Sequence, residues 1–148
     1  MIRILLASLH LLAFGIGLGA VWVRARALGA LPDRARLTTA LRADSLWGLA
    51  AFLWLSTGLW RWLGGIEKDA SYYTGNHIFL TKMGLFVLVV LLEIRPVVTL
   101  GKWRRQLAAR AEPDLGSAGT LSRISYVQAG VLLLMILAAT AMARGYGS

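Results

Sequence analysis

Four long apolar stretches, separated by polar segments, dominate the sequence. They cover Ile4–Val23, Ser45–Leu63, Ile78–Leu100 and Ser125–Met142. A helix of about 20 apolar residues is long enough to cross the hydrocarbon core of a bilayer, and each stretch is close to that length. The pattern therefore predicts an all-α integral membrane protein with four spans.

The segments between the spans carry most of the positive charge. The loops Arg24–Asp44 and Gly101–Ile124 hold five basic residues each, and together ten of the 16 Lys and Arg residues. Because cytoplasmic loops of membrane proteins are enriched in Lys and Arg, both loops are expected in the cytoplasm and both termini outside it. Short connections favour antiparallel neighbours, which gives an up-down-up-down four-helix bundle. We expect a multi-pass membrane protein.

The composition agrees with this interpretation and excludes several functions. Of the 148 residues, 57% are hydrophobic and 16% are charged, whereas soluble domains average about 45–50% and 25%. A net charge of +9 would favour nucleic-acid binding in a soluble chain, but here the basic loops account for it. The lipid bilayer is thus the expected partner, and nucleic acid is not. The sequence has no cysteine, which excludes disulfides, thiolate metal sites and a cysteine nucleophile. No repeat or linker divides the chain, so one domain over residues 1–148 is expected.

Small residues are expected where spans pack closely, because lipid gives helices no hydrophobic reason to associate. Gly15 and Gly19 form such a pair on the first span, with Gly17 on another face. Between Arg34 and Arg42, leucine and alanine recur at roughly helical spacing. This spacing predicts a short interfacial helix in the first basic loop.

Few polar side chains lie at membrane depth, where such groups are candidates for function. His10 lies roughly 9 Å inside the first span and Lys82 roughly 6 Å inside the third, counted from the same side at about 1.5 Å per residue. The two therefore fall at one level, near His77 at the mouth of the third span and Arg61 at the end of the second. Each also has a structural interpretation: a hydrogen-bonded His10, a Lys82 whose ammonium reaches the headgroups, a solvated His77, and an Arg61 that anchors its span.

The third span contains a second polar pair, Glu93 and Arg95. Residues two apart point away from each other on a helix, so each needs another partner. Three alternatives stay open for Glu93: a protonated carboxyl, a proton relay, or a pairing with Arg24 or a hydroxyl. On the second span, Trp47 and Trp54 share a face at seven-residue spacing, which we interpret as packing.

Three segments resemble a bacterial family of four-span membrane proteins of unknown function. They are "SLHLLAFGIGLGA" in the first span, "RADSLWGLAAFLWLSTGL" at the start of the second and "YYTGNHIFLTKMGLF" at the start of the third, followed by Pro96 and "KWRR". More distantly, a histidine with a glycine-rich helix and a later lysine is similar to the membrane domains of copper-resistance D-type proteins and J-type protoporphyrinogen oxidases. In those oxidases a membrane histidine is thought to ligate b-type haem. The resemblance implies His10 as a ligand of haem iron, with Lys82 as second ligand or haem-site residue. Together with the charge bias, the resemblance to the bacterial family implies a multi-pass protein of a bacterial inner membrane.

Two hypotheses of different classes stay open. In the first, the protein is a redox module that binds haem b, in which Lys82 or His77 lies opposite His10 and Arg61 lies near the propionates. In the second, it is a non-enzymatic accessory or structural subunit, associated with a membrane-protein partner or a second copy. Copper transport is disfavoured, because Cu(I) prefers clusters of soft ligands and the methionines are scattered.

Catalytic templates are missing from the sequence. It has no nucleophile elbow, no phosphate-binding loop and no helical zinc motif. No catalytic residue is therefore assigned, and whether the protein is an enzyme stays open. The outer loop "EKDASYYTGN" is expected to cover the mouth of the bundle as a lid or a docking patch.

Overall fold

The computed structural model describes residues 1–63 and 77–146, apart from the side chains of Arg61 and Trp62. This part of the chain is helical and contains no strand. Its helices are α1 (Ile2–Gly29), α2 (Arg34–Leu63), α4 (His77–Ala108) and α5 (Ala118–Ala143).

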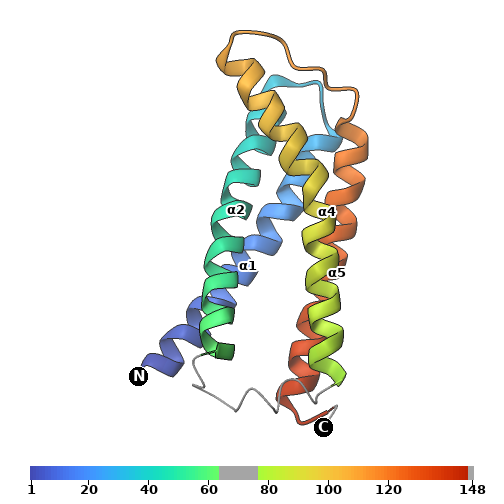
Figure 1. Ribbon diagram of the computed structural model, residues 1–148. Helices are drawn as coiled ribbons and strands as arrows, with labels where there is room; N and C mark the ends of the chain where they lie inside the picture. The colour runs from blue at the N-terminus through green and yellow to red at the C-terminus, as the bar shows by residue number, and fades with distance from the viewer. Residues whose placement is uncertain (64–76, 147–148) are drawn as a thin grey trace.

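The helices run alternately up and down (Figure 1). Both termini lie at one end of the bundle, and the connections 30–33 and 109–117 lie at the other. We call the end with these two connections the basic end, because most Lys and Arg residues lie near it. The predicted all-α bundle with antiparallel neighbouring helices is confirmed for the described residues.

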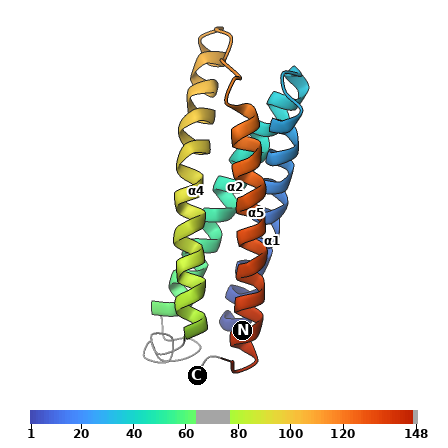
Figure 2. The same ribbon diagram turned by 90° about the vertical axis from the view of Figure 1, so that its right-hand side faces the viewer.

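The order of the helices around the bundle determines which side chains can meet. α1 packs most extensively against α2 and also packs against α5, and α5 packs against α4. α2 and α4 make little contact. Figure 2 shows α1 and α4 on opposite sides, with α2 and α5 between them. Residues on α1 and α4 therefore face one another only across the interior.

Three of the described helices, α1, α4 and α5, are long and apolar enough to cross a membrane. α2 has 30 residues, but Trp47, Trp54, Trp60 and Arg61 make its apolar stretch less hydrophobic. That α2 crosses the membrane stays a prediction, as does the orientation of the bundle.

At the basic end the helices extend beyond the predicted spans, so the predicted loops are too long. α1 continues to Gly29, and the predicted interfacial helix is in fact the first part of α2. Asp33 Oδ1 accepts a hydrogen bond from the Ala35 amide at 2.9 Å, which caps the start of α2. Leu37 is buried in the same apolar cluster as Leu28. Capping and packing therefore make the polar segment helical.

The second basic connection is shortened in the same way. α4 continues to Ala108 and α5 begins at Ala118. The Trp103 side chain is 1% exposed, and its Nε1 donates a hydrogen bond to the Asp114 carbonyl at 2.9 Å. This bond fixes the connection against α4.

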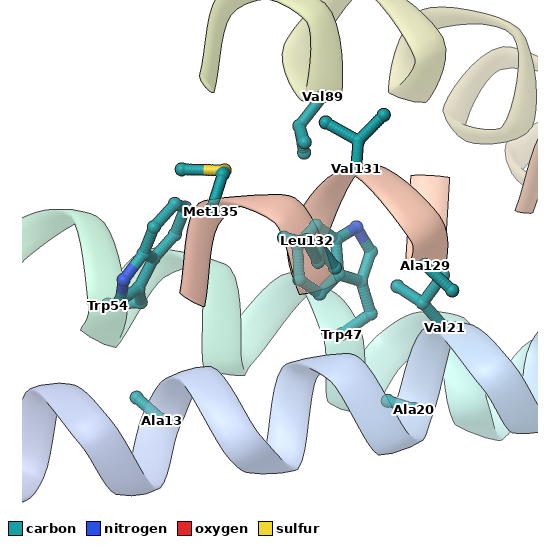
Figure 3. Packing of buried hydrophobic residues seen from close by; sticks show 10 residues of the cluster. All are labelled: Ala13, Ala20, Val21, Trp47, Trp54, Val89, Ala129, Val131, Leu132 and Met135. Atoms are coloured by element: carbon teal, nitrogen blue, oxygen red, sulfur yellow. The ribbon is translucent and has the colours of Figure 1, made fainter. Parts of the chain in front are cut away.

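The middle of the bundle is filled by an apolar cluster from all four described helices (Figure 3). Trp47 and Trp54 of α2 lie beside Leu132 and Met135 of α5, with Val89 of α4 above them. Trp54 also makes edge contacts with the Phe14 and Phe86 rings at 5.4 and 5.6 Å between centroids. The interpretation of both tryptophans as packing residues is confirmed.

The prediction that Gly15 and Gly19 allow close packing of the first helix is wrong, because Gly17 makes the close contact instead. A Cβ added at Gly15 or Gly19 would meet nothing within 4 Å, whereas one at Gly17 would lie 2.9 Å from Trp47 Cζ3. Gly17 is the buried member of the three. The rotation of α1, which glycine spacing does not determine, turns Gly17 toward α2 and the other two outward.

Candidate functional site

Arg24 lies at the centre of a polar cluster that joins all four described helices. It is 0% exposed, although the sequence placed it at the start of a loop. Its Nη1 donates to Asp44 Oδ1 at 2.7 Å and to Glu93 Oε1 at 2.8 Å. Nη2 donates to Glu93 Oε2 at 2.8 Å and to Gln128 Oε1 at 2.7 Å, and Nε donates to Ser125 Oγ at 3.1 Å. The five N–H groups of a guanidinium thus meet five acceptors.

A second arginine completes the cluster. Arg104 Nη2 lies 2.7 Å from Asp44 Oδ2, and it also donates to the Leu41 carbonyl at 2.8 Å and to Ser45 Oγ at 3.1 Å. Gln128 Nε2 donates to Glu93 Oε2 at 2.8 Å. We define the polar cluster as Arg24, Asp44, Glu93, Arg104, Ser125 and Gln128. Two guanidinium groups balance two carboxylates, so the cluster is formally neutral.

Of the alternatives for Glu93, the structure shows the pairing with Arg24, while a proton relay stays a prediction. The Glu93 carboxylate forms a two-pronged ion pair with Arg24, the geometry in which a guanidinium binds a carboxylate most strongly. Arg95 lies exposed on the other side of α4, as expected for residues two apart. The sequence therefore identified the need of Glu93 for a partner and named Arg24 among the candidates.

A groove of about 680 Å³ runs between α2 and α4, where these two helices make little contact. Its walls are apolar and include Phe52, Leu55, Val90 and Ile94. All four of these side chains are exposed at the surface of the bundle, so the groove opens sideways. Its polar lining residues gather toward the basic end and are Asp44, Ser45, Glu93 and Arg104. The groove therefore joins an apolar lateral opening to the polar cluster.

His10 lies toward the other end of the bundle and contacts α2. Its Nδ1 lies 3.0 Å from Thr57 Oγ1. The Thr57 hydroxyl is directed at the Leu53 carbonyl, 2.7 Å away, and lies 3.0 Å from that of Trp54. A hydroxyl has one proton, so when Thr57 donates it to a backbone carbonyl, Thr57 Oγ1 can only accept a hydrogen bond from a protonated His10 Nδ1.

The His10 ring fits closely against α2. It lies 5.9 Å from the Trp54 ring, between centroids. A Cβ added at Gly58 would lie 2.9 Å from His10 Cε1. Glycine at position 58 therefore makes room for the imidazole.

The other predicted site residues have separate surroundings. Lys82 is half-buried on α4, with its Nζ 5.4 Å from the centroid of the Phe79 ring on the same helix. His77 is exposed at the first position of α4. The Arg61 side chain and the loop "EKDASYYTGN" lie outside the described residues. The described contacts of His10 are thus on α2 and those of Lys82 on α4, and neither residue lines the groove.

Within residues 1–63 and 77–146, no group of three or more His, Asp or Glu side chains is placed to hold a metal ion. The ligand set proposed for haem iron stays a prediction, because the described contacts of His10 and Lys82 do not test it. The polar cluster, in contrast, was only partly anticipated. Arg24, Asp44 and Ser125 each stand at the basic end of a predicted span, and that shared level was the available indication.

The sequence comparison identifies the family. A model of a family described as predicted membrane proteins, DUF2214, matches residues 2–147. The chain belongs to this family. No curated protein and no solved structure matches it. The more distant resemblance to copper-resistance proteins and porphyrinogen oxidases stays a prediction.

Proposed function

We propose that this DUF2214 protein binds a lipid-like amphiphile in the groove between α2 and α4. The hydrophobic chain of the ligand enters sideways from the bilayer, and its polar group rests against the polar cluster at the basic end. The observation that carries the proposal is the groove itself, which opens sideways between α2 and α4 and ends at charged residues.

The dimensions and lining of the groove support this proposal. Its volume of about 680 Å³ falls within the range of about 300–1,000 Å³ typical of small-molecule sites. Such sites have mostly apolar walls and a few polar groups that orient the ligand. The groove has this composition, with its polar groups at one end only.

The proposal places α2 in the membrane beside the other three helices. α2 packs extensively against α1, and its buried Trp47 and Trp54 belong to the same apolar cluster as residues of α1, α4 and α5. A helix with this packing completes a four-span bundle. Charge bias then orients the basic end toward the cytoplasm and both termini away from it, in a bacterial inner membrane.

A matched pair of glycine substitutions tests whether the groove binds lipid. Gly48 lines the groove, and a Cβ added there meets nothing within 4 Å. A phenylalanine at this position projects into the groove without a clash at its Cβ. Gly130 on α5 is equally open and lies outside the groove, so Gly130→Phe is the control.

The experiment measures binding of a spin-labelled phospholipid to the protein in nanodiscs. We expect Gly48→Phe to weaken binding about tenfold, which corresponds to about 1.4 kcal/mol, and Gly130→Phe to leave it unchanged. Equal binding by the wild type and both variants would overturn the proposal. Equal loss in both variants would also overturn it, because the effect would then not come from the groove.

Haem binding at His10 is a second candidate, and one observation favours it. Histidines that ligate metals usually donate their other ring N–H to a hydrogen-bond acceptor, which fixes the tautomer. His10 Nδ1 has such an acceptor in Thr57 Oγ1. Visible spectra of the oxidised and dithionite-reduced protein from a haem-replete host test this candidate. A stoichiometric Soret band that disappears in His10→Ala would support it, and a colourless folded protein would refute it.

A further inference from the structure

The two arginines of the polar cluster differ in how many of their donors are used. All five N–H groups of Arg24 meet acceptors inside the bundle. Within residues 1–63 and 77–146, the hydrogen bonds of Arg104 all go through Nη2. The Nε and Nη1 of Arg104 therefore carry three further N–H donors. The Arg104 side chain is 37% exposed, and it lines the groove.

The charges around Arg104 favour an anion. Both carboxylates of the cluster are paired with Arg24, and Asp44 is paired with Arg104 as well. Farther toward the basic end, the exposed residues of α2 and α4 include Arg42 and Arg105. The described acids of the connections there are Asp33, Glu112 and Asp114, fewer than the cations near this end. A cationic headgroup would meet net repulsion at this position, and an anionic one attraction.

We propose that the groove is selective for anionic phospholipids and that Arg104 binds the headgroup phosphate. This inference rests on the proposed function, because it assumes that the acyl chain occupies the groove. A guanidinium fork matches two oxygens of a phosphate, which gives both attraction and a fixed orientation. A lipid with net negative charge, such as phosphatidylglycerol, has no cationic group that would be repelled by the arginines around the phosphate. In phosphatidylcholine the quaternary ammonium faces the same cations.

The test compares phosphatidylglycerol with phosphatidylcholine as spin-labelled ligands of the full chain in nanodiscs. We expect the wild type to prefer phosphatidylglycerol by about fivefold, as for one partly exposed charged contact. Arg104→Gln should abolish the preference: both lipids lose the contact to their phosphate, and the binding of phosphatidylglycerol should fall about fivefold more than that of phosphatidylcholine. Lys102→Gln removes an exposed charge of the same helix that does not line the groove, and it should keep the preference. Arg104→Lys keeps the charge and loses the planar guanidinium, so it should keep part of the preference for phosphatidylglycerol that Arg104→Gln abolishes.

The outcomes separate this inference from the proposed function. If both lipids bind equally to the wild type but Gly48→Phe weakens both, the groove binds lipid and the inference about Arg104 is wrong. If the preference is lost equally in Lys102→Gln, surface charge explains it and the inference is again wrong. If Gly48→Phe changes nothing, the proposed function has failed. Melting temperatures of all variants show whether Arg104→Gln stays folded, and a bound phosphatidylcholine in that variant shows that its groove is intact.

Discussion

Replacing Arg24 with methionine should cost the protein a large part of its stability. The side chain is fully buried and makes five hydrogen bonds, three of them to carboxylates. In Arg24→Met, Asp44 keeps its contact with Arg104, but of its described partners Glu93 keeps only Gln128. Removing one partner of a buried ion pair typically costs about 3–5 kcal/mol, because a buried charge is left uncompensated. We expect a loss in this range.

The stability lost in Arg24→Met depends on the balance of charges within the polar cluster, and a double variant tests this dependence. Removing Arg24 alone leaves one guanidinium and two carboxylates. Removing both Arg24 and Glu93 leaves Arg104 and Asp44, which are already paired at 2.7 Å. Since a buried ion pair can often be replaced by apolar residues without loss, Arg24→Met/Glu93→Met should be more stable than Arg24→Met by about 1–3 kcal/mol, a typical coupling energy for contacting residues.

The assay is thermal unfolding in detergent, followed by circular dichroism. For a chain of this size about 1 kcal/mol shifts the melting temperature by about 2–4 °C, so Arg24→Met should melt roughly 10 °C below the wild type. Arg26→Met is the matched control, because Arg26 is exposed on the same helix and its loss should change the stability by less than about 0.5 kcal/mol. If Arg24→Met melts with the control, or if the double variant is the least stable, the neutral cluster does not hold the helices together.

Three further substitutions test the local geometry. Gly17→Ala places a Cβ 2.9 Å from Trp47 Cζ3 and should cost about 1–3 kcal/mol of overpacking, whereas Gly19→Ala meets open space and should be neutral or stabilising by up to about 1 kcal/mol; equal melting temperatures would contradict this difference. Gly58→Ala should displace the His10 ring and break its hydrogen bond to Thr57, which changes the ¹⁵N chemical shifts of the imidazole. Gly58→Ala should also lower the melting temperature, but not in a His10→Ala background, where there is no ring to displace. Trp103→Phe should lose the hydrogen bond to the Asp114 carbonyl and about 1 kcal/mol, measured by unfolding; an unchanged stability would show that the bond does not hold the connection.

The sequence was sufficient to predict the helices and their alternation. Runs of about 20 apolar residues are specific to membrane helices, and short connections force neighbours to be antiparallel. It was insufficient to predict where the helices end at the basic side. Hydropathy detects the apolar part only, while the first turns of α2 depend on the cap at Asp33 and on the burial of Leu37. The cap is local, but the packing of Leu37 with Leu28 exists only once α2 lies against α1.

Whether His10 and Lys82 lie opposite one another depends on more than their depth, and it stays a prediction. Depth follows from counting residues along each span, and this count places His10 and Lys82 at about the same level. Their neighbours depend on the order of the helices around the bundle, which places α1 beside α2 and α5 and puts α4 on the opposite side. His10 accordingly has its described contacts with Thr57 and Trp54 of α2. Sequence spacing within single helices contains no information on that order.

The location of Arg24 shows why the distribution of charge along the sequence does not determine which arginines are buried. Positive-inside bias treats every arginine near a span end as a loop residue, but the depth of an arginine depends on the acceptors that neighbouring helices offer it. Here α2, α4 and α5 supply Asp44, Glu93, Ser125 and Gln128 at the same level, so Arg24 is held inside. Arg104 obtains its partners through one nitrogen only and stays partly exposed. The first arginine, with every donor used, can stabilise the bundle but has none left for a ligand. The second can bind one, so variants of Arg24 should change stability first, and variants of Arg104 should change binding first.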